Sequence, residues 1–196
     1  FNRQKKDHFK LAICPNNEKL IVHTSNFRKV KRIDDVVMIF HQLRDLLPCK
    51  LLLVGDGPDR ARIERRCKEL DMLSDVRFLG KLDAIEEVLS VADLFLMPSE
   101  SESFGLAALE ALACEVPLIT SNAGGLPELN IPGVTGFLSN VGDVDDMVKN
   151  AAFILKDENL PTFKANALAR AKEFDVAKIL PAYEAFYEKI IAESKP

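Results

Sequence analysis

The stretch Lys50-Leu-Leu-Leu-Val-Gly-Asp-Gly-Pro58 joins an apolar run to a turn built from glycine and proline. Its apolar residues are consecutive and do not alternate with polar ones, which is typical of a strand covered on both faces. The two glycines and Pro58 then interrupt regular structure. The stretch therefore predicts a buried strand of a parallel sheet, followed by a turn.

Similar short apolar runs recur along the chain and alternate with segments whose apolar residues have helical spacing. We predict strands over residues 19–24, 50–54, 76–79, 94–97, 117–120 and 136–138, and helices over 32–47, 60–70, 85–92, 103–113, 144–155, 160–172 and 179–192. The alternation predicts the α/β class, a Rossmann-like parallel sheet with helices on both faces. We expect a single domain over residues 19–196, preceded by a lead-in or linker over 1–18.

Composition limits the classes of protein to which the chain can belong. The chain has 196 residues and a formal net charge of −4, which argues against a general nucleic-acid binder. It contains no apolar run of about 18 residues, the length that a transmembrane helix needs. Its four cysteines are scattered and lack CxxC spacing, so we expect no zinc site and a reducing cytoplasm. The chain does not begin with Met, and we expect it to be a piece of a longer or processed protein.

In a parallel α/β sheet, ligands bind outside the carboxyl ends of the strands. The segment Ser25–Arg32 follows the first predicted strand and carries Arg28 and Lys31. Two cations in such a loop could clamp a diphosphate, with Arg forming bidentate hydrogen bonds and Lys acting as a point charge. The alternative is a basic, solvated entry to the next helix.

The segment Pro98-Ser-Glu-Ser-Glu-Ser-Phe-Gly105 follows another predicted strand. The start of the next helix could bind a phosphate or a sugar hydroxyl there, and Gly105 would allow close approach. Glu102 and Glu110 lie eight residues apart, roughly 12 Å along a helix, too far for a shared proton. They are better placed to hold two parts of one extended ligand. The alternative is a capping residue and a solvated carboxylate.

Other patterns are weaker. Gly55-Asp-Gly-Pro58 fails as a dinucleotide fingerprint, because Arg60 occupies the position of the third glycine. The glycines of Ala123–Glu128 suit either a ligand or a structural turn. Asp143, Asp145 and Asp146 have a spacing that could hold a metal, but we expect them to cap a helix. The three histidines show no triad spacing.

Taken together, five motifs resemble those of the retaining family 4 glycosyltransferases, which have the GT-B fold. The motifs are Glu102-Ser-Phe-Gly-Leu-Ala-Ala-Leu-Glu110, Gly55-Asp-Gly-Pro58, Phe78-Leu-Gly80, Gly124-Gly-Leu-Pro-Glu128 and Gly133-Val-Thr-Gly136. The resemblance extends from about Lys19 to the carboxyl terminus. It implies the nucleotide-sugar-binding half of a two-domain enzyme, with a preceding acceptor-binding half that this chain lacks. The last helix would cross back to that half, and the chain alone would be inactive.

The resemblance also implies roles for residues. As catalytic residues, Arg28 and Lys31 would hold the diphosphate without a metal, and Glu102 would hold the donor sugar or phosphate. Glu110 would bind the ribose hydroxyls, and the backbone near Gly80 and Lys81 would read the base. The remaining donor-binding residues would be Asn26, Gly55, Gly57, Phe104, Gly105 and Leu106. Asn26 stands where most of the family has Arg, and Glu115 replaces a usual Gly.

Within the family, Ser25–Arg32 resembles the branch that transfers N-acetylglucosamine from its UDP form to L-malate in bacillithiol biosynthesis. The partners expected are therefore a nucleotide sugar and a small acceptor held by the other half, with a homo-oligomer possible and no nucleic acid. Three alternatives stay open: a family member with another sugar and acceptor, a non-catalytic nucleotide or sugar-phosphate binding module, and a nucleotide-sugar epimerase.

Overall fold

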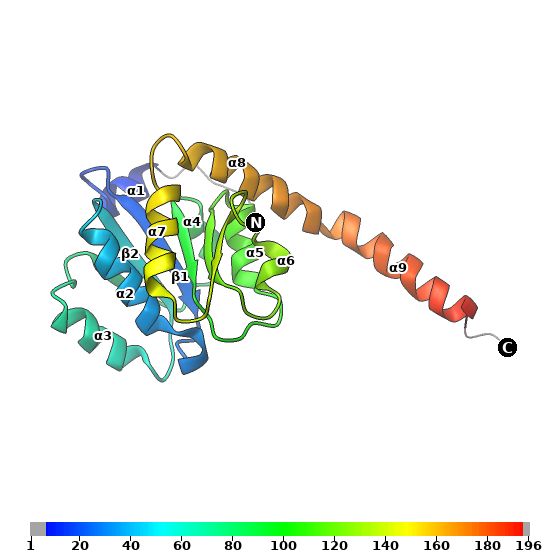
Figure 1. Ribbon diagram of the computed structural model, residues 1–196, viewed down its shortest axis with the longest axis horizontal. Coiled ribbons are helices and arrows are strands. Elements are labelled where there is room, and N and C mark those ends of the chain that lie inside the picture. Colours follow the sequence, from blue (N-terminus) through cyan, green and yellow to red (C-terminus); the bar gives the residue numbers. More distant parts are fainter. Residues whose placement is uncertain (1–6, 194–196) are drawn as a thin grey trace.

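The computed structural model describes residues 7–193 and contains one six-stranded sheet with the strand order β3-β2-β1-β4-β5-β6 (Figure 1). All neighbouring strands in it are parallel. The strands are β1 (Lys19–Ser25), β2 (Cys49–Gly55), β3 (Val76–Gly80), β4 (Leu94–Met97), β5 (Leu118–Ser121) and β6 (Gly136–Ser139). The predicted Rossmann-like sheet and all six predicted strands are confirmed.

The helices alternate with these strands. They are α1 (Asp7–Ile13), α2 (Ile33–Arg44), α3 (Arg60–Glu69), α4 (Ile85–Leu89), α5 (Leu106–Ala113), α6 (Leu126–Leu129), α7 (Val144–Ile154), α8 (Leu160–Ala171) and α9 (Val176–Glu193), with 3-10 turns η1 (Lys29–Lys31) and η2 (Lys172–Phe174). The seven predicted helices are all present, and most of their bounds are within three residues of the prediction.

Strand β1 lies in the middle of the sheet. Val22 is in register with Leu52 of β2 on one side and with Phe95 of β4 on the other. The chain runs outward from β1 to β3 and then returns to β4, so the strand order reverses between β1 and β4. The loops that follow these two strands leave toward opposite faces, and this arrangement opens a crevice at their carboxyl ends.

Each face of the sheet has its own hydrophobic core. Helices α2, α3 and α7 cover one face, where Ile21, Leu51 and Leu96 point. Helices α4, α5 and α6 cover the other face, where Leu20, Val22 and Phe95 point. The unbroken apolar character of the strands follows from this double coverage.

The predicted irregular lead-in is wrong for residues 7–13, which form helix α1, while residues 1–6 lie outside the described part of the chain. A buried carboxylate explains the docking of this helix. Asp93 accepts hydrogen bonds from Lys10 Nζ (2.7 Å), Lys164 Nζ (2.7 Å) and the Leu20 N–H (2.9 Å). It thereby links α1, β1 and α8 at the amino-terminal edge of the sheet.

Helix α9 projects from the domain as a single rod (Figure 1). Its large apolar side chains recur every three or four residues and are exposed: Ile179, Leu180, Tyr183, Phe186, Tyr187, Ile190 and Ile191. We call these residues the α9 stripe. Such spacing places them along one side of the helix, which is the pattern of a helix that packs against a partner surface.

Candidate functional site

A cavity of about 430 Å³ opens at the carboxyl ends of β1 and β4, where the topology predicts a crevice. Its lining comes from the segments that follow the two strands: Thr24, Ser25, Asn26, Lys31, Met97, Glu102, Ser103, Phe104, Gly105, Leu106 and Ala107. We call it the strand-end cavity. The structure thus brings together six of the predicted site residues, namely Asn26, Lys31, Glu102, Phe104, Gly105 and Leu106.

An ion pair crosses this cavity. Lys31 Nζ lies 2.6 Å from Glu102 Oε1, and the side chains are 21% and 9% exposed. The same carboxylate oxygen accepts a hydrogen bond from Ser99 Oγ at 2.9 Å. Ser99 therefore orients Glu102, a role that sequence reasoning missed although Ser99 lies in the quoted segment 98–105. Among residues 7–193, the structure shows no hydrogen bond to the second oxygen of Glu102, which can therefore accept one from another donor.

The helix that follows Glu102 begins later than predicted. Residues 103–105 are not helical, and α5 starts at Leu106 because Gly105 has a left-handed backbone with φ of 91°. No side chain caps this start, and Leu106 is 68% exposed. The first N–H groups of a helix lack intrahelical partners, so they form a partly positive surface beside Glu102 and Lys31.

Glycines hold the cavity wall from behind. A Cβ on Gly124 would lie 1.7 Å from the Glu102 carbonyl oxygen, and the Gly125 N–H donates to that oxygen at 3.2 Å. Likewise, a Cβ on Gly55 would lie 1.8 Å from the Ser25 carbonyl oxygen. The motif glycines of these two turns thus permit close packing of the loops that carry Asn26 and Glu102.

His23 joins the two strands behind the cavity. The ring is fully buried; its Nδ1 lies 2.9 Å from the Leu96 carbonyl oxygen and its Nε2 lies 2.8 Å from Ser25 Oγ. Burial lowers the pKa of His23 to about 4, so the ring is neutral near pH 7. The carbonyl then fixes the Nδ1–H tautomer, and Ser25 donates to Nε2.

The second glutamate of the motif lies in a separate cavity. Glu110, on α5, lines a cavity of about 570 Å³ together with Leu109, Leu168 and Phe174. Burial raises the pKa of the Glu110 carboxyl, and the Glu86 carboxylate acts in the same direction. Leu106 lines both cavities, so the two cavities adjoin at the start of α5; Glu110 lies on this helix, whereas Glu102 precedes it.

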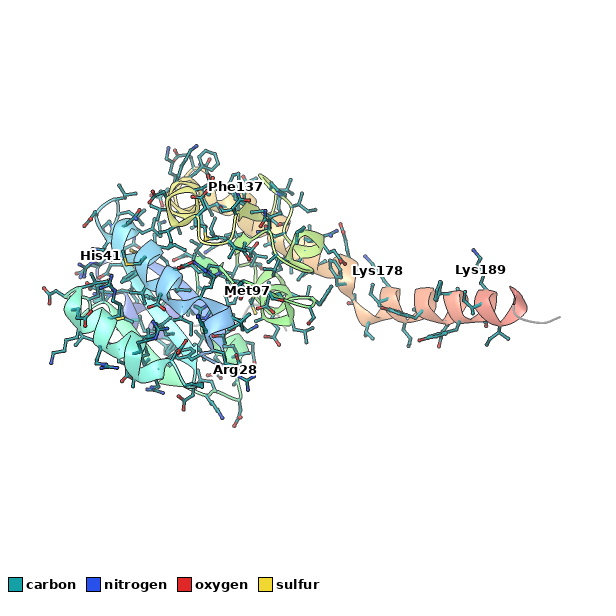
Figure 2. The ribbon with its side chains drawn as sticks, turned by 60° about the horizontal axis from the view of Figure 1, so that its bottom comes forward. Arg28, His41, Met97, Phe137, Lys178 and Lys189 are labelled. Carbon is teal, nitrogen blue, oxygen red and sulfur yellow. The ribbon has the colours of Figure 1, made fainter. Side chains whose placement is uncertain are left out.

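Other predicted residues lie outside the strand-end cavity. Arg28 is exposed and belongs to none of the ion pairs that the structure shows among residues 7–193; Figure 2 shows it at the periphery of the domain, whereas Met97 lies in the interior. Gly57 packs against the Asn26 backbone. Gly80 has a φ of 69°, and Lys81 beside it is exposed.

The acidic motif after β6 is a helix cap, as expected. Asp143 accepts a hydrogen bond from the Asp146 N–H at 3.1 Å, and Asp146 pairs with Ser139 Oγ at 2.7 Å. Within residues 7–193, no group of three or more His, Cys, Asp and Glu side chains could hold a metal ion. None of the helices described is long and apolar enough to cross a membrane.

Comparison with known proteins identifies the family to which the chain belongs. Residues 4–171 match the family model described as glycosyl transferases group 1. The chain belongs to this family. It is 44% identical over 184 residues to N-acetyl-alpha-D-glucosaminyl L-malate synthase of Bacillus anthracis, covering 91% of this chain and 48% of the relative. It is 31% identical to a sulfoquinovosyl transferase of Arabidopsis thaliana, covering 79% of this chain and 30% of the relative.

Solved structures of glycosyltransferases show the same fold. A sucrose-phosphate synthase from Thermosynechococcus elongatus is 29% identical with a TM-score of 0.87, over 99% of this chain and 50% of that one. Anabaena HepE in complex with UDP is 23% identical with a TM-score of 0.85, over 96% of this chain and 56% of that one. The group 1 chain thus has the Rossmann-like architecture of one half of a GT-B fold, and it spans 48% and 30% of the lengths of these two curated relatives.

Proposed function

We propose that the chain is the nucleotide-sugar-binding half of a retaining glycosyltransferase. The observation that carries the proposal is the Lys31–Glu102 ion pair, 2.6 Å long, beside the uncapped start of α5. It sets a cation, a carboxylate and free backbone N–H groups around one cavity at the topological switch point. A sugar diphosphate needs this combination of groups, because its phosphates are anionic and its sugar offers hydroxyls.

In the proposed reaction, the chain stabilises the departing diphosphate. Negative charge develops on the leaving phosphate as the sugar leaves, and fixed positive groups lower the barrier most where that charge forms. Lys31 and the N–H groups of Leu106 and Ala107 would supply this stabilisation, with Arg28 reaching in from the exposed loop. These groups make a divalent metal unnecessary in the proposal.

The remaining contacts follow from the two cavities. Glu102 would accept hydrogen bonds from the donor sugar through its available oxygen, while Lys31 turns toward the diphosphate. Glu110 would accept from the ribose hydroxyls, and the backbone near Gly80 and Lys81 would contact the base. The partner half would hold the acceptor and cover the α9 stripe.

For the donor and acceptor, we propose UDP-N-acetylglucosamine and L-malate. The support is the 44% identity to the Bacillus anthracis synthase, together with the string Ser25–Arg32. A cytoplasmic location accords with Cys14, Cys49, Cys67 and Cys114, which are buried free thiols.

Calorimetric titration of the chain with UDP, UDP-N-acetylglucosamine, and GDP- and ADP-sugars tests the proposal. We expect the UDP compounds to bind and EDTA to leave their affinities unchanged. Arg28→Ala should weaken UDP by about 1.5–3 kcal/mol, the contribution of a charged hydrogen bond, and Lys29→Ala on the same exposed loop is the matched control. Loss of binding in EDTA would contradict the metal-free mechanism, and absence of binding by any nucleotide sugar would contradict the proposed function.

A test of the proposed acceptor requires the proposed two-domain enzyme. We expect that enzyme to transfer N-acetylglucosamine to L-malate, with retention at the anomeric carbon. Transfer to another acceptor would correct the substrate assignment. Conversion of the nucleotide sugar without any acceptor would point to an epimerase.

A further inference from the structure

The segment Glu102–Gly105 carries the donor-side groups but has little regular structure of its own. Residues 103–105 lie between the end of β4 and the start of α5 and form neither helix nor strand. Their positions must therefore be fixed by contacts with other elements. We call Glu102–Gly105 the donor loop.

One support comes from the β5 side of the sheet. The Gly125 N–H donates to the Glu102 carbonyl oxygen at 3.2 Å, immediately before helix α6. A second support comes from the end of α8. Phe174, the last residue of η2, packs its ring edge-on against Phe104, with ring centroids 5.7 Å apart and an interplanar angle of 64°.

A single arginine joins the two supports. The Arg170 guanidinium lies over the Phe174 ring, 4.8 Å from its centroid, and also donates a hydrogen bond to the Glu128 carbonyl oxygen in α6. It forms an ion pair with Glu173 in η2 as well. The contacts thus form a closed circuit from the donor loop through α6, Arg170 and Phe174 back to Phe104.

We propose that Phe174 is a positioning residue that holds the donor loop in its binding conformation through Phe104. The ring of Phe174 is half-buried and lines the Glu110 cavity but not the strand-end cavity, so it reaches the donor loop through Phe104. We call the support of the donor loop by Phe174 the brace. The brace rests on the observed contacts, whereas the ligand of the donor loop rests on the proposed function.

The position of the brace links the site to α9. Only Asp175 separates Phe174 from the first residue of α9, and Asp175 Oδ1 accepts a hydrogen bond from the Ala177 N–H at 2.8 Å. A tilt of α9 at this junction therefore moves the ring that supports Phe104. When a partner surface covers the α9 stripe, it sets the orientation of α9 and, through Phe174, the position of the donor loop.

Phe174→Leu, Phe104→Leu and the double variant test the brace. Phe153→Leu is the matched control, because Phe153 on α7 makes similar ring contacts with Phe137 and Phe163 on the other face of the sheet. Hydrogen exchange of the amides of residues 103–106, measured without added ligand, reports the donor loop directly. We expect Phe174→Leu to accelerate this exchange about tenfold, because the loss of an aromatic pair makes opening of the loop easier by about that factor. Phe153→Leu should leave the exchange rate unchanged.

UDP-sugar affinity gives the second readout. Phe174→Leu should raise the Kd about tenfold in the native background, because a loop that is rarely in its binding conformation lowers the apparent affinity in proportion. It should add little in the Phe104→Leu background, since both residues act through one contact. Phe174→Tyr, which keeps the ring, should show the exchange rate and the Kd of the native chain.

Exchange and affinity together distinguish a failure of the brace from a failure of the proposed function. Faster exchange in Phe174→Leu without any UDP-sugar binding by the native chain would support the brace and contradict the proposed function. Exchange unchanged by Phe174→Leu, or a Kd effect of equal size in both backgrounds, would overturn the brace.

Discussion

At the scale of single residues, Glu102 has two tasks that can be separated. Its Oε1 neutralises Lys31, and its other oxygen is available to a ligand. Removing the carboxylate therefore releases a cation and removes an acceptor in one substitution. Which effect is observed depends on whether the added ligand carries a sugar.

We predict that Glu102→Gln leaves UDP affinity unchanged or improves it, because the charge that competes for Lys31 is lost. The same variant should reduce the additional affinity contributed by the sugar by about 1–3 kcal/mol, the cost of unpaired polar groups. Calorimetry with UDP and UDP-sugar measures both values. Glu100→Gln, an exposed neutralisation two residues away, is the control. Equal weakening of both ligands would show that Glu102 does not distinguish the sugar.

The sequence allowed much of this site to be predicted, because local patterns encode where strands end. Parallel-sheet topology predicts that Lys31 and Glu102 lie at neighbouring strand ends, and the family resemblance adds Asn26. The Lys31–Glu102 contact itself could not be predicted, since it spans 71 residues and depends on how two loops fold. The support from Phe174 has no sequence signal either, because an aromatic residue at a helix end is common.

At the scale of elements, Asp93 joins three segments of the chain. Burial alone would raise the pKa of this carboxyl, but Lys164, Lys10 and the Leu20 N–H outweigh burial and lower it. Helix α1 could not be predicted because it has only seven residues and depends on this distant carboxylate. The longer helices and the strands are predictable from the spacing of their apolar residues, since each helix has an apolar side and each strand is covered on both faces.

We predict that Asp93→Asn reduces the free energy of unfolding at pH 7 by about 3 kcal/mol, because it removes the buried negative charge that pairs with the Lys10 and Lys164 ammonium groups. A carboxyl with a lowered pKa stabilises the fold above its unfolded value of about 3.9, and this contribution disappears as the pH falls through the lower folded value. The stabilities of the variant and the native chain should therefore begin to converge as the pH falls below about 4. Urea unfolding from pH 7 to pH 3 measures this.

Asp157→Asn provides the control for that experiment. Asp157 pairs with Lys19, but its side chain is 91% exposed, so its loss should change the unfolding free energy little. A loss in Asp93→Asn no larger than in this control would mean that the cluster contributes specificity of packing and not stability.

The turn between β5 and α6 allows a second prediction at this scale. Gly124 and Gly133 both have positive φ, 56° and 75°, but a Cβ on Gly133 meets nothing within 4 Å. We predict that Gly133→Ala costs about 1–2 kcal/mol of stability from backbone strain alone. Gly124→Ala should cost more and should also weaken UDP-sugar binding, because its methyl group displaces Glu102. If Gly124→Ala and Gly133→Ala weakened UDP-sugar binding equally, the packing role of Gly124 would be contradicted.

At the scale of the whole molecule, α9 exposes a run of large apolar side chains along its length. Leu180 and Tyr187 of the α9 stripe are 55% and 61% exposed. We predict that replacing both by Ser leaves the unfolding free energy of this chain within about 0.5 kcal/mol, as for other surface substitutions. In the proposed two-domain enzyme, the same pair of substitutions should lower glycosyl transfer, because the stripe would be buried there. Lys178→Ser is the control; an unchanged transfer rate in the stripe variant would contradict a docking role.

The central place of β1 has a consequence for synthesis. A ribosome delivers β2 soon after β1, but the strand that completes the other edge of β1 follows roughly 70 residues later, or about 4–14 s at usual translation rates. During that interval, Ile21 and Val22 offer an unpaired edge that can join another nascent chain. We therefore expect the growing polypeptide to need protection by chaperones until Leu94–Met97 emerges, and slow codons between β1 and β4 to increase misassembly.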